Sequence, residues 1–211
     1  MSVHSQLETL LRLEREQRDI EKNLPEDANS GALESAVLEM ADNVLAARER
    51  DGATSDLERL ADLCPSIEGP AIIDLLFRIL NDDEPSVRLA AGEALLDAGY
   101  ERYAEFARGV ERLLETEGSG PAKMEAPLLL AEIGEPGTLG LLSRFLESEN
   151  ADVVAGAIEA VYRIADPKGL PAVVALEGDT RTVHLEDFQD DSGSTIGELA
   201  AECAEALRDI E

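Results

Sequence analysis

A short helical phrase recurs along this chain, and its repetition constrains the fold more than any other feature. The segment from Ser86 to Gly99 aligns with the segment from Asp152 to Ala165, with small, acidic and apolar residues at matching positions. One apolar column of the alignment contains Leu60, Leu95, Leu130, Val161 and Leu207. A second lies three residues later and contains Leu63, Ala98, Ile133, Ile164 and Ile210. Self-similarity at a period of about 30 to 40 residues is typical of stacked helical pairs. The sequence therefore predicts an all-α fold, an α-solenoid.

Each copy of the phrase follows a segment with apolar residues at helical spacing, which indicates an amphipathic helix. These residues fall into five groups: Val37, Met40, Val44 and Leu45; Ile72, Leu76, Ile79 and Leu80; Phe106, Val110, Leu113 and Leu114; Leu142, Phe145 and Leu146; Leu170, Val173 and Val174. We therefore expect about five helical hairpins in two layers. In the second layer, Ala and Gly residues such as Gly92 and Gly156 are expected to let helices approach closely.

Start and stop signals agree with this pairing. Pro85 suits the first turn of a helix, and Ser86 or a nearby Asp is expected to cap it. Asn150 and Asp152 hold the same place in a later repeat, and the Gly118–Pro121 segment does so in between.

Residues 1–30 are predicted to form an N-terminal helix and loop, ahead of a repeat domain over residues 31–211. A heptad that starts at Val3, Leu7 and Leu10 would next place Glu14, Gln17 and Glu21 in its seam, so a long coiled coil is excluded. We expect the first half of this helix to dock on the helices that follow. A weak dimer contact through the N-terminal helix is the alternative to a monomer.

The chain is strongly acidic, with 46 acidic and 18 basic residues and a formal net charge of -28. Such a charge repels itself unless salt screens it, as the Debye length falls to roughly 3 Å at 1 M. The pattern resembles proteins of salt-accumulating halophiles. A nucleic-acid partner is not expected, because the sequence has no basic stripe, no Trp and only 3% aromatic residues.

Cellular location is predicted from what the sequence lacks. It has no apolar run near 18 residues and no secretory pattern after Met1, so we expect no membrane partner and a cytoplasmic protein. Cys64 and Cys203 lack metal-type spacing and are expected to be reduced thiols.

The phrase also carries a family resemblance. The run from Asp82 to Leu95 resembles a HEAT repeat of the short, phycobilisome-lyase type, and the run from Asn150 to Val161 is a second good match. Weaker matches lie at 57–64 and 123–134, so the resemblance covers roughly residues 32 to 211. The resemblance implies a scaffold or adaptor, because most proteins of this class have that role and a few are enzymes.

The enzyme members of that class make specific demands. Deoxyhypusine hydroxylase holds iron with repeated His-Glu pairs, but this chain has only His4 and His184, and neither precedes Glu. HEAT-like DNA glycosylases use a basic concave surface with Trp, which this chain also lacks. Phycobilin lyases match only through the shared scaffold motif.

An acidic insertion over about 177–193 interrupts the last repeat, because Val161 and Leu207 are 46 residues apart where earlier intervals are 31 to 35. Insertions in solenoids form loops that often bind something. The insertion carries four neighbouring carboxylates, which are Glu186, Asp187, Asp190 and Asp191. They lack the residue order of a calcium-binding loop, so we expect a solvated loop that binds no metal and no cofactor.

Four residues of the second-layer helices are the predicted partner-binding residues: Arg88, Lys123, Tyr162 and Arg163. Arg88 is also expected to pair with the turn acid Asp82 or Asp83, and Lys123 fills the same column. The leading hypothesis is a non-enzymatic adaptor that binds a protein partner on the concave face, in a regulatory or assembly role. The alternative is a HEAT-like enzyme or small-molecule lyase with a site near the insertion, in a pocket that contains His184.

Overall fold

Ten α-helices account for most of the described chain. The computed structural model describes residues 12, 13, 15, 16, 18–20, 23, 30–183 and 194–210. The helices are α2 (Ser30–Ala46), α3 (Ala53–Leu63), α4 (Pro70–Ile79), α5 (Pro85–Glu101), α6 (Tyr103–Glu115), α7 (Pro121–Ile133), α8 (Thr138–Leu146), α9 (Ala151–Ile164), α10 (Leu170–Val174) and α11 (Ile196–Arg208). Short 3-10 helices span Cys64–Ser66 and Pro167–Gly169. Over these residues the only β-type pairing is one antiparallel bridge between Thr182 and Thr195.

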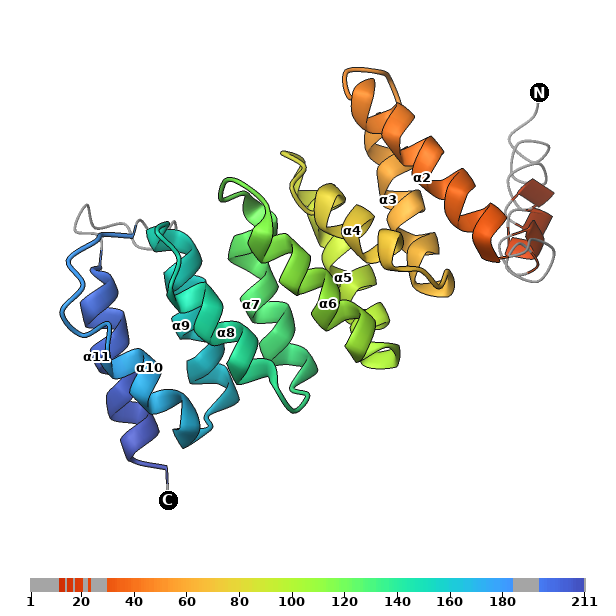
Figure 1. Ribbon diagram of the computed structural model, residues 1–211. Helices are drawn as coiled ribbons and strands as arrows, with labels where there is room; N and C mark the ends of the chain where they lie inside the picture. Colours follow the sequence, from red (N-terminus) through yellow and green to blue (C-terminus); the bar gives the residue numbers. More distant parts are fainter. Residues whose placement is uncertain are drawn as a thin grey trace.

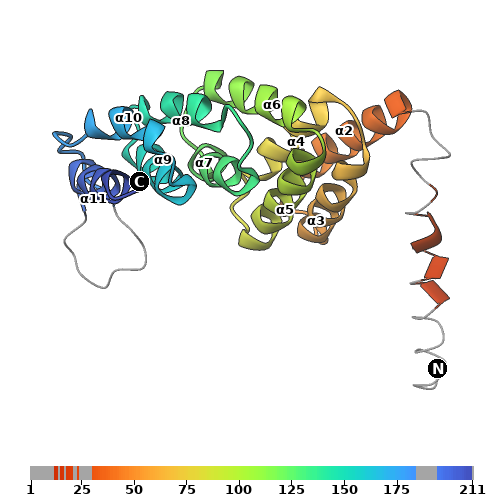
Figure 2. The same ribbon diagram turned by 90° about the horizontal axis from the view of Figure 1, so that it is seen from below.

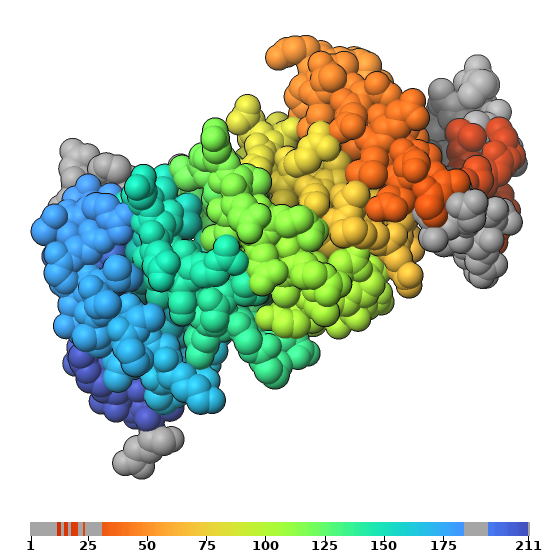
Figure 3. Space-filling model, in the orientation of Figure 1, coloured from red at the N-terminus to blue at the C-terminus, as the bar shows by residue number. Residues whose placement is uncertain are grey.

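Consecutive helices form five antiparallel hairpins that stack into an elongated array (Figure 1). Even-numbered helices contact one another in a first layer, and odd-numbered helices do so in a second. Figure 2 shows the two layers edge-on, with the array bent so that α7 and α9 lie at the hollow of the second layer. In the space-filling view the first-layer helices form a continuous surface from one repeat to the next (Figure 3). The predicted all-α solenoid of five hairpins is confirmed.

The first repeat column forms the seam between the layers. All five of its members are buried, at 5% exposure or less: Leu60, Leu95, Leu130, Val161 and Leu207. A fully buried side chain of this size contributes about 1.5 to 3 kcal/mol relative to an exposed one. The second column is weaker than expected. Leu63 and Ile164 are half-buried, and Ile210 lies beyond the end of α11 with 39% of its surface exposed.

Two residues expected in the first-layer stripe also differ from the prediction. Met40 is 56% exposed, and Val174 is 36% exposed. Met40 lies on α2, in the first hairpin of the array. Among the described helices α2 has one first-layer neighbour, α4, so only one of its sides is covered by another helix of that layer. Val174 ends the short helix α10, whose single buried apolar residue is Val173.

Gly156 shows that close helix packing occurs where the sequence predicted it. A Cβ atom added at Gly156 of α9 would lie 2.7 Å from the carbonyl oxygen of Met124 in α7, so only glycine permits this separation. Gly92 does not have this role, because an added Cβ there meets no atom within 4 Å. The prediction of close approach is therefore correct for α9 and wrong for Gly92 in α5.

Helix capping differs from the expectation at one helix. Asn150 caps α9, where its side-chain oxygen accepts a hydrogen bond from the Val153 amide. Ser86 does not cap α5, which begins at Pro85 without a side-chain cap. Of the two candidates expected at this helix, the nearby acid is the one that accepts: Asp82 accepts from the Glu84 amide just before the helix.

Polar contacts join each pair of neighbouring turns along one edge of the array, and we call these four the turn-edge contacts. They are Arg48 to the Asp82 carboxylate, the Ala122 amide to the Asn81 side chain, the Asn150 side chain to the Ser119 hydroxyl, and Arg181 to the carbonyls of Ser148 and Glu149. Each donor and its acceptor come from adjacent hairpins. The contacts therefore fix the offset between successive repeats.

The N-terminal segment and the insertion are described only in part. Leu13 and Ile20 are 50% and 63% exposed. Residues 1–11 lie outside the described residues, so their docking and the dimer contact stay predictions. Residues 184–193 of the insertion also lie outside the described residues, so the solvated loop expected there stays a prediction. No helix of the described chain is both long and apolar enough to span a bilayer.

Candidate functional site

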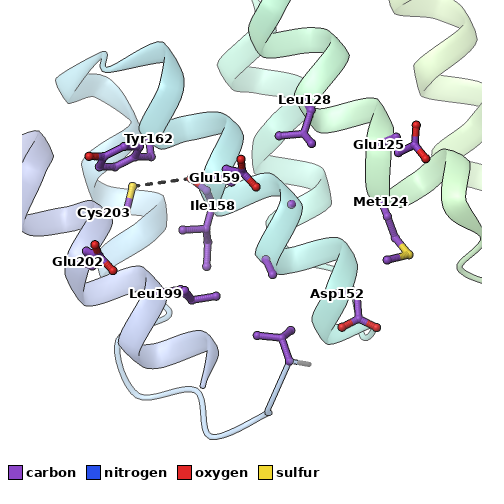
Figure 4. Close-up of a pocket in the computed structure, with 13 residues that line it drawn as sticks. Met124, Glu125, Leu128, Asp152, Ile158, Glu159, Tyr162, Leu199, Glu202 and Cys203 are labelled. Carbon is purple, nitrogen blue, oxygen red and sulfur yellow. Dashed lines mark hydrogen bonds between the residues drawn. The ribbon is translucent and has the colours of Figure 1, made fainter. Parts of the chain in front are cut away.

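A groove of about 670 Å³ opens between α7, α9 and α11 at the hollow of the second layer (Figure 4). Its apolar lining comes from all three helices and from the end of the described part of the insertion: Met124, Leu128, Ile158, Tyr162, Val183 and Leu199. Ile158 and Val183 are almost fully buried, whereas Met124 and Tyr162 remain 37% and 51% exposed. Apolar side chains thus face solvent inside a concave site.

The second layer positions this groove. Gly156 lets α9 approach α7 closely, and α11 packs on the other side of α9. On α9 itself, Ala155 and Gly156 leave a low stretch of surface between larger side chains. The groove floor is therefore made by backbone proximity and small residues, which explains part of the Ala and Gly pattern in the phrase.

Four carboxylates also line the groove, and we call them the acidic rim: Glu125, Asp152, Glu159 and Glu202. Burial raises the pKa of Glu125, and the nearby Arg88 guanidinium opposes that rise. Arg88 Nε lies 3.6 Å from Glu125 Oε1, and Arg163 Nη2 donates to Glu159 Oε1 at 2.6 Å. Among the described residues, Asp152 and Glu202 have no ion pair. Within the part of the chain that the structure describes, no lysine or arginine lines the groove.

The thiol in the groove is not suited to nucleophilic chemistry. Cys203 is 2% exposed, and its sulfur lies 3.8 Å from the carbonyl oxygen of Ile158. Burial, together with the charge of Glu202, raises its pKa to about 11, so the thiol is neutral near pH 7. Cys64 is likewise buried and free, which agrees with the prediction of reduced thiols. In the part of the chain that the structure describes, no cluster of His, Cys, Asp and Glu is placed to hold a metal.

Tyr162 is the predicted residue that the structure places in the groove. Arg163 lies beside it and reaches the groove only through its ion pair with Glu159. Arg88 likewise lies outside the lining and faces it through Glu125.

The predicted pairing of Arg88 needs a correction. Its Nη1 donates to the backbone carbonyls of Asp82 and Asp83, at 3.1 and 2.9 Å, and neither carboxylate is its partner. The Asp82 carboxylate is held by Arg48 instead. Carbonyls of a tight turn point outward together, so one guanidinium satisfies two of them.

Lys123 has a comparable structural contact. Its Nζ donates to the Thr116 carbonyl at 2.6 Å, in the turn before α7, and burial lowers its pKa. Lys123 does not line the groove. The column that contains Arg88 and Lys123 therefore anchors turns to helices.

Sequence reasoning missed most of the groove, including Met124, Glu125 and Leu128 on α7. One signal was present. Leu89 and Met124 share a column six residues before the core column, and both are exposed, at 63% and 37%. Apolar residues at an outward position of a repeat indicate a binding surface.

Comparisons with known proteins give structural similarity alone. No protein-family model and no curated protein matches the chain. An engineered protein of known structure is 19% identical, with 90% of this chain and 96% of that chain covered and a TM-score of 0.39. A designed armadillo repeat protein in complex with the peptide (KR)4 is 17% identical, with coverage of 84% and 92% and a TM-score of 0.36. The HEAT type therefore stays a prediction.

Proposed function

We propose that this α-solenoid is a non-enzymatic scaffold that holds a segment of a partner protein in the groove between α7, α9 and α11. The observation that carries the proposal is the exposure of apolar side chains, above all Met124 and Tyr162, inside a concave site of the second layer. Exposed apolar surface in such a place is characteristic of interaction sites, and Tyr is among the residues that contribute most to binding energy.

Rigidity supports the same function. The groove lies on helices whose offset is fixed by the turn-edge contacts and by the close approach at Gly156. A surface that is ordered before binding loses little conformational entropy when the partner docks. A regulatory or assembly role, as expected from the sequence, suits a protein of this kind.

A second candidate is a small-molecule lyase, as the sequence-based alternative has it. The groove volume of about 670 Å³ lies in the range of small-molecule sites. Val183 of the insertion lines it, while His184, which the alternative places in the pocket, lies outside the described residues.

The test is affinity capture with the full chain, followed by binding measurements with each purified partner. Tyr162→Ala is expected to weaken binding about tenfold, as loss of a central aromatic residue does. Tyr100→Ala is the matched control, because Tyr100 is 57% exposed and does not line the groove. Equal affinities of the two variants would contradict the proposal. Turnover of a small molecule that His184→Ala abolishes would establish the lyase.

A further inference from the structure

The groove combines an apolar floor with charge of one sign. Met124, Leu128 and Leu199 offer apolar surface, the four carboxylates of the acidic rim line the same groove, and no basic side chain of the described residues does so. Arg88 and Arg163 each meet one carboxylate of the rim from outside the lining. Among the described residues, the carboxylates of Asp152 and Glu202 have no ion pair within the chain, so they are the most available to a cation of the partner.

We propose that the occupant of the groove is a protein segment that carries both apolar side chains and arginine or lysine side chains. This inference rests on the proposed scaffold function and adds the chemistry of the partner. Apolar side chains of the segment fill the floor beside Ala155 and Gly156, and its cations meet the acidic rim. Arginine fits best, because its planar guanidinium forms paired hydrogen bonds with a carboxylate.

The rim also sets a spacing for those cations. Asp152 and Glu159 are seven residues apart on α9 and both line the groove, so they lie about 10.5 Å apart along the helix axis. Arg163 already binds Oε1 of Glu159, so a partner cation would share that carboxylate with it. A segment that runs along α9 matches this distance with basic residues about three positions apart if it is extended. If the segment is helical, the matching separation is about seven positions.

Other occupants are disfavoured by charge. A second copy of this chain would bring another net charge of -28 to an already negative site. Nucleic acid would be repelled by the same field. The groove is also too polar at its rim for a purely apolar segment, since docking would bury carboxylates without partners.

Three synthetic peptides of about 14 residues test the inference against the full chain. All share one set of leucines, and their polar positions are filled with Arg, Gln or Glu. Fluorescence anisotropy is expected to give about tenfold tighter binding for the Arg peptide than for the Gln peptide in about 0.2 M KCl. The Glu peptide should not bind, and the advantage of Arg should shrink in about 3 M KCl.

Charge-neutral variants locate the effect. Asp152→Asn combined with Glu202→Gln is expected to reduce the preference for Arg over Gln to about threefold or less, while binding of the Gln peptide persists. Glu93→Gln combined with Asp97→Asn is the matched control, because both carboxylates are exposed on α5 and lie outside the groove. Circular dichroism confirms that each variant folds.

The outcomes separate the inference from the function. Equal binding of the Arg and Gln peptides, with both weakened by Tyr162→Ala, overturns the charge preference and leaves the scaffold intact. Failure of all three peptides to bind overturns the inference as well. If captured partners bind the Tyr162→Ala variant as tightly as the unchanged protein, the groove is not the scaffold's binding site.

Discussion

Arg48 binds both carboxylate oxygens of Asp82 and so ties the turn after α2 to the turn after α4. Arg48 Nε donates to Oδ2 at 2.6 Å, and Nη2 donates to Oδ1 at 2.7 Å. The side chains are 29% and 6% exposed, and among the described ion pairs Arg102 with Glu105 is similarly buried, at 19% and 15%. The hydrogen bonds lower the pKa of Asp82 and raise that of Arg48.

Removing this pair should destabilise the protein in a pH-dependent way. Arg48→Met is expected to lower the free energy of unfolding by about 2 kcal/mol at pH 7, because it leaves a nearly buried carboxylate without its charged partner, with the Glu84 amide as its remaining donor among the described residues. Since the folded-state pKa of Asp82 is below its ordinary 3.8, the stabilisation is full above that value and is lost as pH falls through the folded-state pKa. Urea titrations of both proteins from pH 7 to pH 3 measure it.

Arg50→Met supplies the control for that experiment. Arg50 lies in the same loop and pairs with Asp56, but both side chains are about half exposed. Exposed pairs contribute about 0.5 kcal/mol or less. A loss as large for Arg50→Met as for Arg48→Met would show that the loop, and not the buried pair, accounts for the stability.

Helix caps give a second prediction. Asn150→Ala should cost about 1 kcal/mol, because the Val153 amide of α9 loses its acceptor. Asn81→Ala should cost a similar amount, since the Ala122 amide in the next hairpin depends on it. Ser86→Ala should change the urea midpoint little, because Ser86 is exposed and caps no helix. A cost for Ser86→Ala equal to the others would disprove this assignment.

Two glycines of the repeated phrase should respond in opposite directions to alanine. Gly156→Ala would place a methyl group against the Met124 carbonyl and force α7 and α9 apart, with an expected cost of about 1 to 3 kcal/mol. Gly92→Ala meets open space within α5 and should stabilise the protein by about 0.5 to 1 kcal/mol. Thermal denaturation of the two variants distinguishes the signs, and a shared sign would refute the packing at Gly156.

The thiols should be unreactive in the folded protein. Burial raises the pKa of Cys64 to about 12, and that of Cys203 is about 11, so neither forms thiolate at pH 8. We expect no reaction with a disulfide reagent under native conditions and two equivalents after denaturation. Each single variant leaves one thiol to test. Rapid modification of the native Cys203→Ala variant would show that Cys64 is accessible, and rapid modification of the native Cys64→Ala variant would show the same for Cys203.

The fold could be predicted from the sequence because the same pattern of apolar residues recurs in each helical hairpin. Leu60, Leu95 and Leu130 occur at one interval in the sequence, and burial follows from that interval alone. The groove was not predictable in this way. Its residues come from several columns of three repeats. Glu125, Gly156 and Glu202 share one column, but a glycine between two acids does not indicate a groove, and only Tyr162 was chosen in advance.

Long-range polar contacts were equally hard to foresee. Asp82 precedes Arg88 by six residues, which suggested a local pair, yet its carboxylate is held by Arg48 from the previous hairpin. Arg181 was missed as well, although it donates to two carbonyls of the preceding turn. Sequence spacing indicates which helices stack, but the side chains that cross between turns depend on the exact geometry of each bend.

The chemistry of the turn-edge contacts has a consequence for the effect of salt on this fold. Three of the four use an amide, a hydroxyl or a carbonyl as acceptor, and only Arg48 with Asp82 is an ion pair. Dissolved ions weaken attraction between opposite charges far more than they weaken bonds to neutral acceptors. The alignment of the hairpins should therefore stay the same from dilute buffer to saturated potassium chloride, even where the overall stability does not.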